Sequence, residues 1–262
     1  NRISPTFCAI SASDLTTPRR ERSRIITTDL STAYLPLETR VVPRDEQEDV
    51  AMKLQMIYFP VRARQEPILM AFAYAKMPCD VLSPTEFYGK GWGDGAKQET
   101  PYGGLPVLLV DGKPLAQSGS ILRYAASLAK LVPADPFEAA LCDSVAEAAS
   151  DLVLAMPLVN MFRGDTFTEK KAAFCATCPT VLKNLAKQYK GPFFLGDNPY
   201  YCDLAVYHYL SLIKLIEPSL LADFPKADVL MAAVEALPGV SDYLANRPEP
   251  VDIGVAPKLV PK

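Results

Sequence analysis

This chain of 262 residues has little of what several classes of binding site require. It contains a single histidine, His208, and this excludes most zinc sites. It has no run of about 18 apolar residues, so we expect no membrane-spanning helix. Its net charge of -3 gives no reason to expect a nucleic-acid partner. With 49% hydrophobic residues, what remains is a globular protein with a substantial core.

The six cysteines show no pairing pattern, which favours a reducing intracellular compartment. Cys175 and Cys178 form a C-x-x-C, but they fall in a stretch that predicts a helix. We therefore interpret them as two ordinary helix residues. His208 lies between Tyr207 and Tyr209 in another predicted helix, so we expect it to be buried and hydrogen-bonded rather than catalytic.

Composition and proline placement divide the chain into four segments. Residues 1–49 contain arginine but no lysine and many serine and threonine residues, which is typical of part of an organelle transit peptide or of a low-complexity tail. A transit peptide would indicate a plastid or mitochondrion, and otherwise we expect the cytosol. Residues 50–131 and 132–250 are predicted domains that meet at the proline-bounded sequence LVPADP, and 251–262 is a predicted C-terminal tail.

The stretch from Lys97 to Tyr124 predicts a loop, a strand, a tight turn, a second strand and a helix. The apolar run PVLLV, which begins at Pro106, is typical of a buried strand. Asp111 and Gly112 are the signal of a two-residue hairpin. The returning strand carries Pro114, so we expect it at an edge of the sheet.

Two features of this stretch predict a ligand site. The bond from Leu105 to Pro106 precedes a buried strand, and a cis peptide there would turn backbone N–H and C=O groups outward. Gln117 and Ser118 begin the helix, where side-chain and backbone donors meet a dipole that favours an anion. Together they predict a small ligand with a peptide-like middle and a carboxylate end.

Three upstream segments complete the first domain. Residues 53–59 and 79–82 predict strands, and residues 64–76 predict an amphipathic helix. Followed by the hairpin and the last helix, they give the order β-α-β and then β-β-α. This order is that of a thioredoxin-like α/β domain.

The second domain is predicted to be all-helical. Pro157 should kink its first helix, and Pro179 should bend or break its second. We expect Asn198 to cap the third, with Pro199 at the first helical position. The predicted helices span residues 137–163, 167–189, 200–216, 226–237 and 239–245.

In both domains the sequence resembles the cytosolic glutathione transferases, and most closely their sigma-like class. The matching segments are YF at 58–59, RARQEPI at 62–68, TPYGGLPVLLVDG at 100–112, LAQSGSILRYAA at 115–126 and FPKADVLMAAVEALPGVSDYLANRP at 224–248. The resemblance implies a thioredoxin-like N-terminal domain followed by an all-helical C-terminal domain. It also implies glutathione as the co-substrate, a small electrophile as the second substrate, and no metal.

The resemblance implies a role for each matching site residue. Tyr58 stands where the tyrosine of this family activates the glutathione thiol, and Arg64 stands where an arginine assists it. Lowering the thiol pKa by two units from about 8.5 requires roughly 2.7 kcal/mol. One charge-assisted hydrogen bond contributes about 1.5–3 kcal/mol, so a tyrosine is sufficient in scale. The residues implied for glutathione binding are Trp92, Lys97, Leu105, Pro106, Gln117 and Ser118.

Two functions of different class remain open. The first is an enzyme that transfers glutathione to an electrophile, or performs the related isomerisation or peroxide reduction. The second is a catalytically weak scaffold subunit that residues 1–49 hold in a larger complex, for which an organelle is one candidate location. The intact set of implied site residues favours the enzyme. Three features favour the scaffold: the long tail, a Trp92 that lies one residue away from its usual position in the family, and a Tyr200 where the family has a Ser or Thr helix cap.

The resemblance also bears on oligomeric state and on substrate. Tyr102 matches an aromatic position that some members insert into a partner subunit, so we expect a homodimer. Met156 and Phe162 are candidate walls of the electrophile pocket. No cysteine follows the first predicted strand, so we do not expect thiol chemistry of the glutaredoxin or omega type.

Overall fold

A computed structural model describes residues 52–259 of the chain. The N-terminal segment 1–49, and with it the expected transit peptide, partner-binding arm and organellar location, lies outside the described residues. Of the predicted C-terminal tail, the structure describes 251–259. Within the described residues, no helix combines the length and the hydropathy needed to cross a lipid bilayer.

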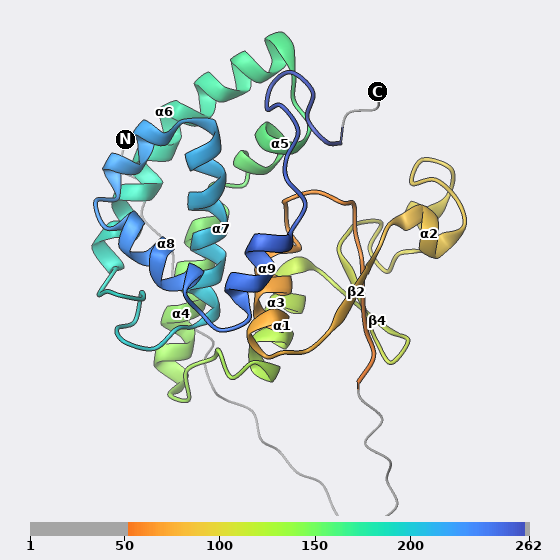
Figure 1. Ribbon diagram of the computed structural model, residues 1–262, viewed down its shortest axis with the longest axis horizontal. Coiled ribbons are helices and arrows are strands. Elements are labelled where there is room, and N and C mark those ends of the chain that lie inside the picture. Colours follow the sequence, from red (N-terminus) through yellow and green to blue (C-terminus); the bar gives the residue numbers. More distant parts are fainter. Residues whose placement is uncertain (1–51, 260–262) are drawn as a thin grey trace, which may run out of the picture. The chain divides into compact units, whose positions relative to one another are not determined.

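Four short strands form one mixed sheet (Figure 1). The strands are β1 (Leu54–Ile57), β2 (Cys79–Leu82), β3 (Val107–Val110) and β4 (Lys113–Ala116), in the spatial order β2-β1-β3-β4. β1 pairs parallel with β2 and antiparallel with β3, and β3 pairs antiparallel with β4. This order confirms the predicted thioredoxin-like domain.

Successive side chains along the strands point to opposite faces of the sheet, and each face packs against its own apolar cluster. Met56 and Leu108 point into the main core, which α1 (Glu66–Tyr74) and α3 (Ser118–Leu128) share. Ile57 and Val107 point to the opposite face, where α2 (Pro84–Tyr88) contributes Tyr88 to a smaller cluster. A 3₁₀ helix, η2 (Ala96–Glu99), follows α2 along the chain.

The hairpin follows its sequence signal. Asp111 and Gly112 connect β3 to β4 with φ angles of 49° and 79°, the left-handed conformations that a two-residue hairpin requires. Asp111 Oδ1 also accepts a hydrogen bond from the backbone N–H of Lys53 at 2.9 Å. Pro114 lies on β4, an edge strand, as predicted.

The second half is helical and is built around α7 (Tyr201–Ile216), which is buried at nearly every position. Figure 1 shows α7 running through the middle of this half, with α4 and α8 beside it. It packs against α4 (Pro136–Ser150), α5 (Ala155–Asn160), η3 (Pro218–Asp223) and α8 (Ala227–Glu235). α6 (Gly164–Gln188) packs against α4, α5 and η3, and the last helix is α9 (Val240–Asn246). α7 also packs against α1 and so joins the two halves in one core.

The helix predicted over 137–163 is two helices, and the break is not at Pro157. The chain leaves α4 after Ser150, where consecutive backbone hydrogen bonds reach back only three residues, as in Val153 N–H to Ser150 O at 3.0 Å. Pro157 lies in the first turn of α5. There its missing N–H has no intrahelical acceptor to lose, so it does not interrupt the helix.

Pro179 does not break α6, which continues from Gly164 to Gln188. Phe174, Cys178 and Leu182 are buried on one side of the helix, on both sides of the proline in sequence. This continuous apolar stripe packs into the core, and tertiary packing outweighs the loss of one backbone hydrogen bond. Cys175 and Cys178 both lie in this helix, and neither forms a disulfide bond with another cysteine of the described region.

The prediction of Asn198 as the cap of α7 is wrong. The helix begins one residue after Tyr200, and Asp203 satisfies the backbone around its start. The fully buried carboxylate of Asp203 accepts N–H groups from Tyr200 at 2.7 Å and from Phe194 at 2.8 Å. A buried acid that reaches back therefore replaces the missing hydroxyl cap.

Candidate functional site

Tyr58 lies directly after β1 and is buried. Its hydroxyl oxygen accepts a hydrogen bond from the backbone N–H of Arg64 at 3.3 Å. Burial raises the pKa of Tyr58, and the Arg64 amide and charge oppose this rise without reversing it. The phenol therefore keeps its proton at neutral pH. Because the amide occupies a lone pair on the oxygen, the hydroxyl proton remains available to an acceptor.

The segment between Tyr58 and α1 is held from both sides. Gln65 donates its side-chain amide to the carbonyls of Phe59 and Val61, both at 3.2 Å. Asn160 of α5 donates to the carbonyl of Arg62 at 2.7 Å. These bonds fix the short loop that carries Arg64, whose own side chain is exposed.

Arg64 lines three cavities, and one of them, the apolar cavity described below, also includes Tyr58. The polar cavity, of about 260 Å³, is lined by Arg64, Tyr102, Gly104, Leu105, Pro106, Ala116, Gln117 and Ser118. Four predicted site residues of the glutathione set, Leu105, Pro106, Gln117 and Ser118, are thus brought together with Arg64. The peptide bond between Leu105 and Pro106 is cis, as the sequence predicted.

The start of α3 forms the floor of the polar cavity. Gln117 precedes the helix with φ 73° and ψ 114°, a conformation that residues other than glycine rarely adopt. Among residues 52–259 no side chain caps this helix start, which leaves its first N–H groups available to a ligand. The arrangement suits an anionic group, because the helix dipole adds to these donors.

The other two predicted binding residues, Trp92 and Lys97, are not among the residues that line this cavity. Trp92 packs edge-on against Phe59, with ring centroids 5.9 Å apart. Lys97 is exposed on η2, and its side chain extends toward Gly103, where an added Cβ would lie 3.8 Å from Lys97 Cε. The structure therefore places Lys97 beside the loop that leads into the polar cavity.

The apolar cavity, of about 460 Å³, lies on the other side of Arg64 and includes Tyr58. Met156 lines it, as predicted, but Phe162 does not: it packs against the main core instead. The segment between β1 and α1 contributes further walls, and the others come from the turn between α4 and α5, from α5 itself and from the C-terminal segment. These wall residues are Phe59, Val61, Ala63, Val153, Leu154, Pro157, Asn160, Met161 and Leu259.

Leu259 is a wall residue that sequence reasoning missed. The C-terminal segment is attached by backbone hydrogen bonds from Leu259 N–H to Asn160 O at 2.8 Å and from Gly164 N–H to Gly254 O at 2.9 Å. Each of these bonds joins residues about 90 to 100 positions apart in the sequence, so no local pattern predicts them. The segment therefore closes one side of the apolar cavity.

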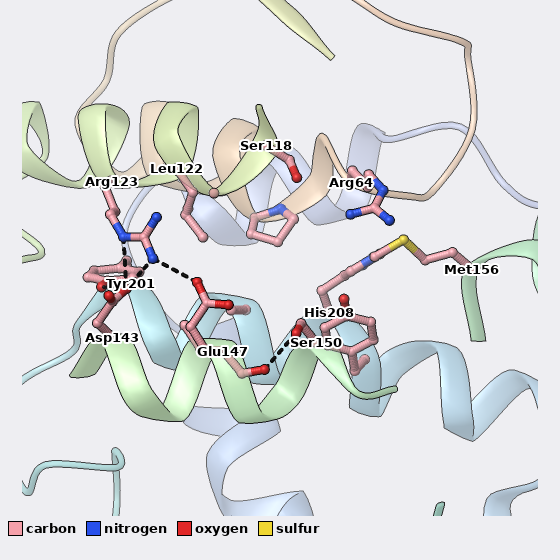
Figure 2. A pocket seen from close by; sticks show the side chains of 15 residues that line it. Arg64, Ser118, Leu122, Arg123, Asp143, Glu147, Ser150, Met156, Tyr201 and His208 are labelled. Carbon is pink, nitrogen blue, oxygen red and sulfur yellow. Dashed lines mark hydrogen bonds and ion pairs between the residues drawn. The ribbon is translucent and has the colours of Figure 1, made fainter. Parts of the chain in front are cut away.

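The α3–α4 cavity, of about 250 Å³, is the third space that Arg64 lines (Figure 2). Figure 2 shows Ser118, Arg64 and Met156 around it, with an ion-pair cluster at the opposite end. In that cluster Arg123 binds Asp143 at 2.7 Å and Glu147 at 2.7 Å.

Tyr201 completes this cluster by donating its hydroxyl to Asp143 at 2.7 Å. Burial and the Asp143 carboxylate raise the pKa of Tyr201, so its phenol stays protonated and remains a donor. The only sequence signal for the cluster was the spacing of Asp143 and Glu147, one helical turn apart.

His208 lines the α3–α4 cavity and is fully buried, as predicted, but it is not hydrogen-bonded. Neither ring nitrogen has a partner among residues 52–259. Burial lowers the pKa of His208 to about 3, with smaller contributions from Arg247 and Arg62. The imidazole is therefore neutral, and nothing around it gives it a catalytic partner in this part of the chain.

The part of the chain that the structure describes contains no group of three or more His, Cys, Asp or Glu side chains able to hold a metal ion. What the described residues bring together here is a protonated phenol, an arginine, a helix start and an adjoining apolar cavity.

Comparison with known proteins agrees with this architecture. A family model described as glutathione S-transferase, C-terminal domain, matches residues 154–247. A probable glutathione S-transferase 6 of Caenorhabditis elegans is 30% identical over 204 residues, covering 74% of this chain and 97% of that protein. A glutathione S-transferase of Anopheles gambiae is 31% identical over 200 residues, covering 74% of this chain and 96% of that protein.

A solved structure is similar over the same region. The glutathione S-transferase from Ascaris lumbricoides matches with a TM-score of 0.65 at 25% identity, over 75% of this chain and 98% of that one. Both domains of the fold are thus present in the order these relatives have. On the strength of its two-domain fold and of near-complete relatives at about 30% identity, the chain belongs to the glutathione S-transferase family.

Proposed function

We propose that the chain binds glutathione in the polar cavity and uses the Tyr58 hydroxyl to activate the thiol for attack on an electrophile in the apolar cavity. One observation carries the proposal: Arg64 lines both cavities, and its backbone amide holds the Tyr58 hydroxyl. The reacting sulfur and the electrophile would then meet beside one protonated phenol.

The polar cavity suits glutathione at its γ-glutamyl end. The γ-glutamyl carboxylate would accept N–H groups at the uncapped start of α3 together with the Ser118 hydroxyl. Leu105 would pair with the cysteinyl backbone. Lys97 and Trp92, in the segment between β2 and β3, would bind the glycine end of glutathione. These assignments follow the family resemblance, and the cavity lining supports those of Leu105, Gln117 and Ser118.

The proposed chemistry is stabilisation of a thiolate by a neutral donor. A Tyr58 O–H bonded to sulfur favours the ionised form, and the Arg64 charge acts in the same direction. The thiolate then attacks the electrophilic carbon. In a substitution, the leaving group departs with the bonding electron pair. The same thiolate also supports glutathione-dependent isomerisation or peroxide reduction.

The electrophile is expected to be apolar and of small-molecule size. The apolar cavity has about 460 Å³, and most of its walls are aliphatic side chains such as Val153, Met156 and Leu259. This volume lies within the roughly 300–1,000 Å³ of small-molecule pockets. Such a cavity would bind the second substrate by apolar burial next to the activated sulfur.

The test is a pH–rate profile for wild type and Tyr58→Phe with glutathione and a chlorodinitrobenzene. We expect turnover at neutral pH to fall by about tenfold or more, or about 1.4 kcal/mol, because the donor to sulfur is lost while ring packing stays. The deficit should shrink at alkaline pH, where glutathione ionises without help. Glutathione affinity, measured by calorimetry, should change little.

Tyr74→Phe is the matched control, because Tyr74 is a half-buried tyrosine at the end of α1. It should leave the profile unchanged. Robust wild-type turnover that Tyr58→Phe leaves intact at every pH would contradict the mechanism. A wild type that binds glutathione and shows no transfer would favour the scaffold function instead.

A further inference from the structure

A further cavity, which we call the α1–α9 cavity, lies outside the three described above. It has about 360 Å³ and is bounded by the segment before α1, by α1, by β2 and by α9 with Pro248. Neither Tyr58 nor Arg64 lines it. Its volume lies within the roughly 300–1,000 Å³ of small-molecule sites.

The walls of this cavity divide into an apolar part and a charged end. The apolar part includes Leu69 of α1, Val81 of β2 and Tyr243 of α9. The charged end holds Arg62 and Arg247, whose side chains are only 10% and 8% exposed. A ligand that fits must therefore combine an apolar body with a group that two buried guanidinium ions can bind.

The charges at that end favour an anion. Arg247 is paired with Glu66 at 2.8 Å, and the Glu66 side chain is 3% exposed. Arg62 donates to the Pro248 carbonyl at 3.0 Å, and its carboxylate partner is Glu249, at 2.8 Å. The Glu249 side chain is 81% exposed, so solvent screens this pair. Two buried positive charges thus face one buried negative charge.

Two polar atoms in the lining side chains have no hydrogen-bond partner within residues 52–259. They are Nε of Arg247 and Oε1 of Gln65, and both side chains lie in the wall of the cavity. Buried polar atoms are normally paired, so each unpaired one calls for an explanation. A bound carboxylate would give the Arg247 group an acceptor.

From these observations we propose that the α1–α9 cavity binds a small apolar monocarboxylate. Its carboxylate takes the place of the Glu249 side chain on Arg62 and extends toward Arg247, and its hydrocarbon part lies against Leu69 and Val81. Arg62 binds the carboxylate as a charge-assisted donor. The proposal does not rest on the chemistry proposed for Tyr58, because the two sites share no charged residue.

The test is isothermal calorimetry of the full chain with octanoate, and with octanol as the neutral probe. We expect octanoate to bind and octanol to bind at least about tenfold more weakly, because the charged contact is lost. Saturating glutathione should leave octanoate affinity unchanged. Equal affinities for the two probes would overturn the proposal, as would displacement of octanoate by glutathione.

Two substitutions should move the affinity in opposite directions. Val81→Trp fills the apolar part from an edge strand where Val81 is 43% exposed, so octanoate affinity should fall by about tenfold or more. Glu249→Gln removes the carboxylate that competes with octanoate for Arg62. The octanoate affinity should therefore rise by roughly two- to fivefold, which corresponds to the energy of an exposed ion pair. An affinity unchanged by both substitutions would overturn the proposal.

Two control variants separate this site from others. Met161→Trp occupies the apolar cavity beside Tyr58, where Met161 is 43% exposed, and should leave octanoate binding intact. Val229→Trp adds an indole at an exposed position on α8 and should also have no effect. Loss of octanoate binding in Met161→Trp, with Val81→Trp unaffected, would assign the ligand to the apolar cavity and overturn the proposal.

Discussion

Replacing Gly239 by alanine tests how closely the two halves of the protein pack. Gly239 precedes α9 with a φ of 76°. A Cβ there would overlap the carbonyl oxygen of Ala73, in α1, and lie 2.9 Å from its carbonyl carbon. Both obstacles are backbone atoms of a packed helix, so they cannot rotate away as a side chain would.

Two costs add up at this position. A left-handed φ costs an L-residue about 1–2 kcal/mol. Overpacking against a rigid neighbour adds about 1–3 kcal/mol. Gly112, in the β3–β4 turn, provides a matched control, because its φ is 79° and an added Cβ would meet nothing within 4 Å. Gly112→Ala should therefore incur only the first cost.

The assay is urea unfolding of the two variants and of wild type, followed by circular dichroism. We expect Gly239→Ala to lower the free energy of unfolding by about 1–3 kcal/mol more than Gly112→Ala. The loss of chain entropy in the unfolded state is the same for both substitutions and cancels in the comparison. Equal losses for the two variants would refute the close approach of α9 to α1.

Three further predictions concern ligand, assembly and pH. Ser118→Ala should weaken glutathione binding by about 1–3 kcal/mol in calorimetry, because the charged γ-glutamyl group loses a hydrogen bond, and equal affinities would contradict the assignment. Tyr102 is 73% exposed, and we propose that it anchors a homodimer, so Tyr102→Ala should shift the particle toward monomer in analytical ultracentrifugation. Burial raises the pKa of Asp203 from 3.8 to about 6, so the folded chain retains a proton that the unfolded chain releases between these values. The free energy of unfolding should therefore fall by about 2 kcal/mol as pH rises from about 4 to about 6, and a urea series at several pH values should show Asp203→Asn to be less pH-dependent.

Several elements were predictable because their signals are local. Asp111 and Gly112 specify a left-handed two-residue turn through their own backbone preferences, and the structure has that turn. The bounds of β2, residues 79–82, also match the prediction. The set from Leu105 to Ser118 was predictable as one site because hairpin and helix start are adjacent in sequence, and the polar cavity does contain its members.

Other features depend on packing between distant segments and could not be predicted. The position of the break after Ser150 and the continuity of α6 through Pro179 depend on which faces the core covers, and proline placement alone does not specify either. His208 was expected to be hydrogen-bonded, and only the tertiary structure shows both ring nitrogens without partners in the described region.

By itself, the sequence determined the order of strands and helices, the hairpin and the start of α3, because turn chemistry and apolar periodicity act over a few neighbouring residues. The tertiary structure decided which side chains share a cavity. Arg247 meets Glu66 across 181 positions, and Leu259 closes the apolar cavity near Tyr58. Such contacts form only when segments far apart in the chain bury their apolar surfaces together, and a local sequence pattern does not specify which segments will do so.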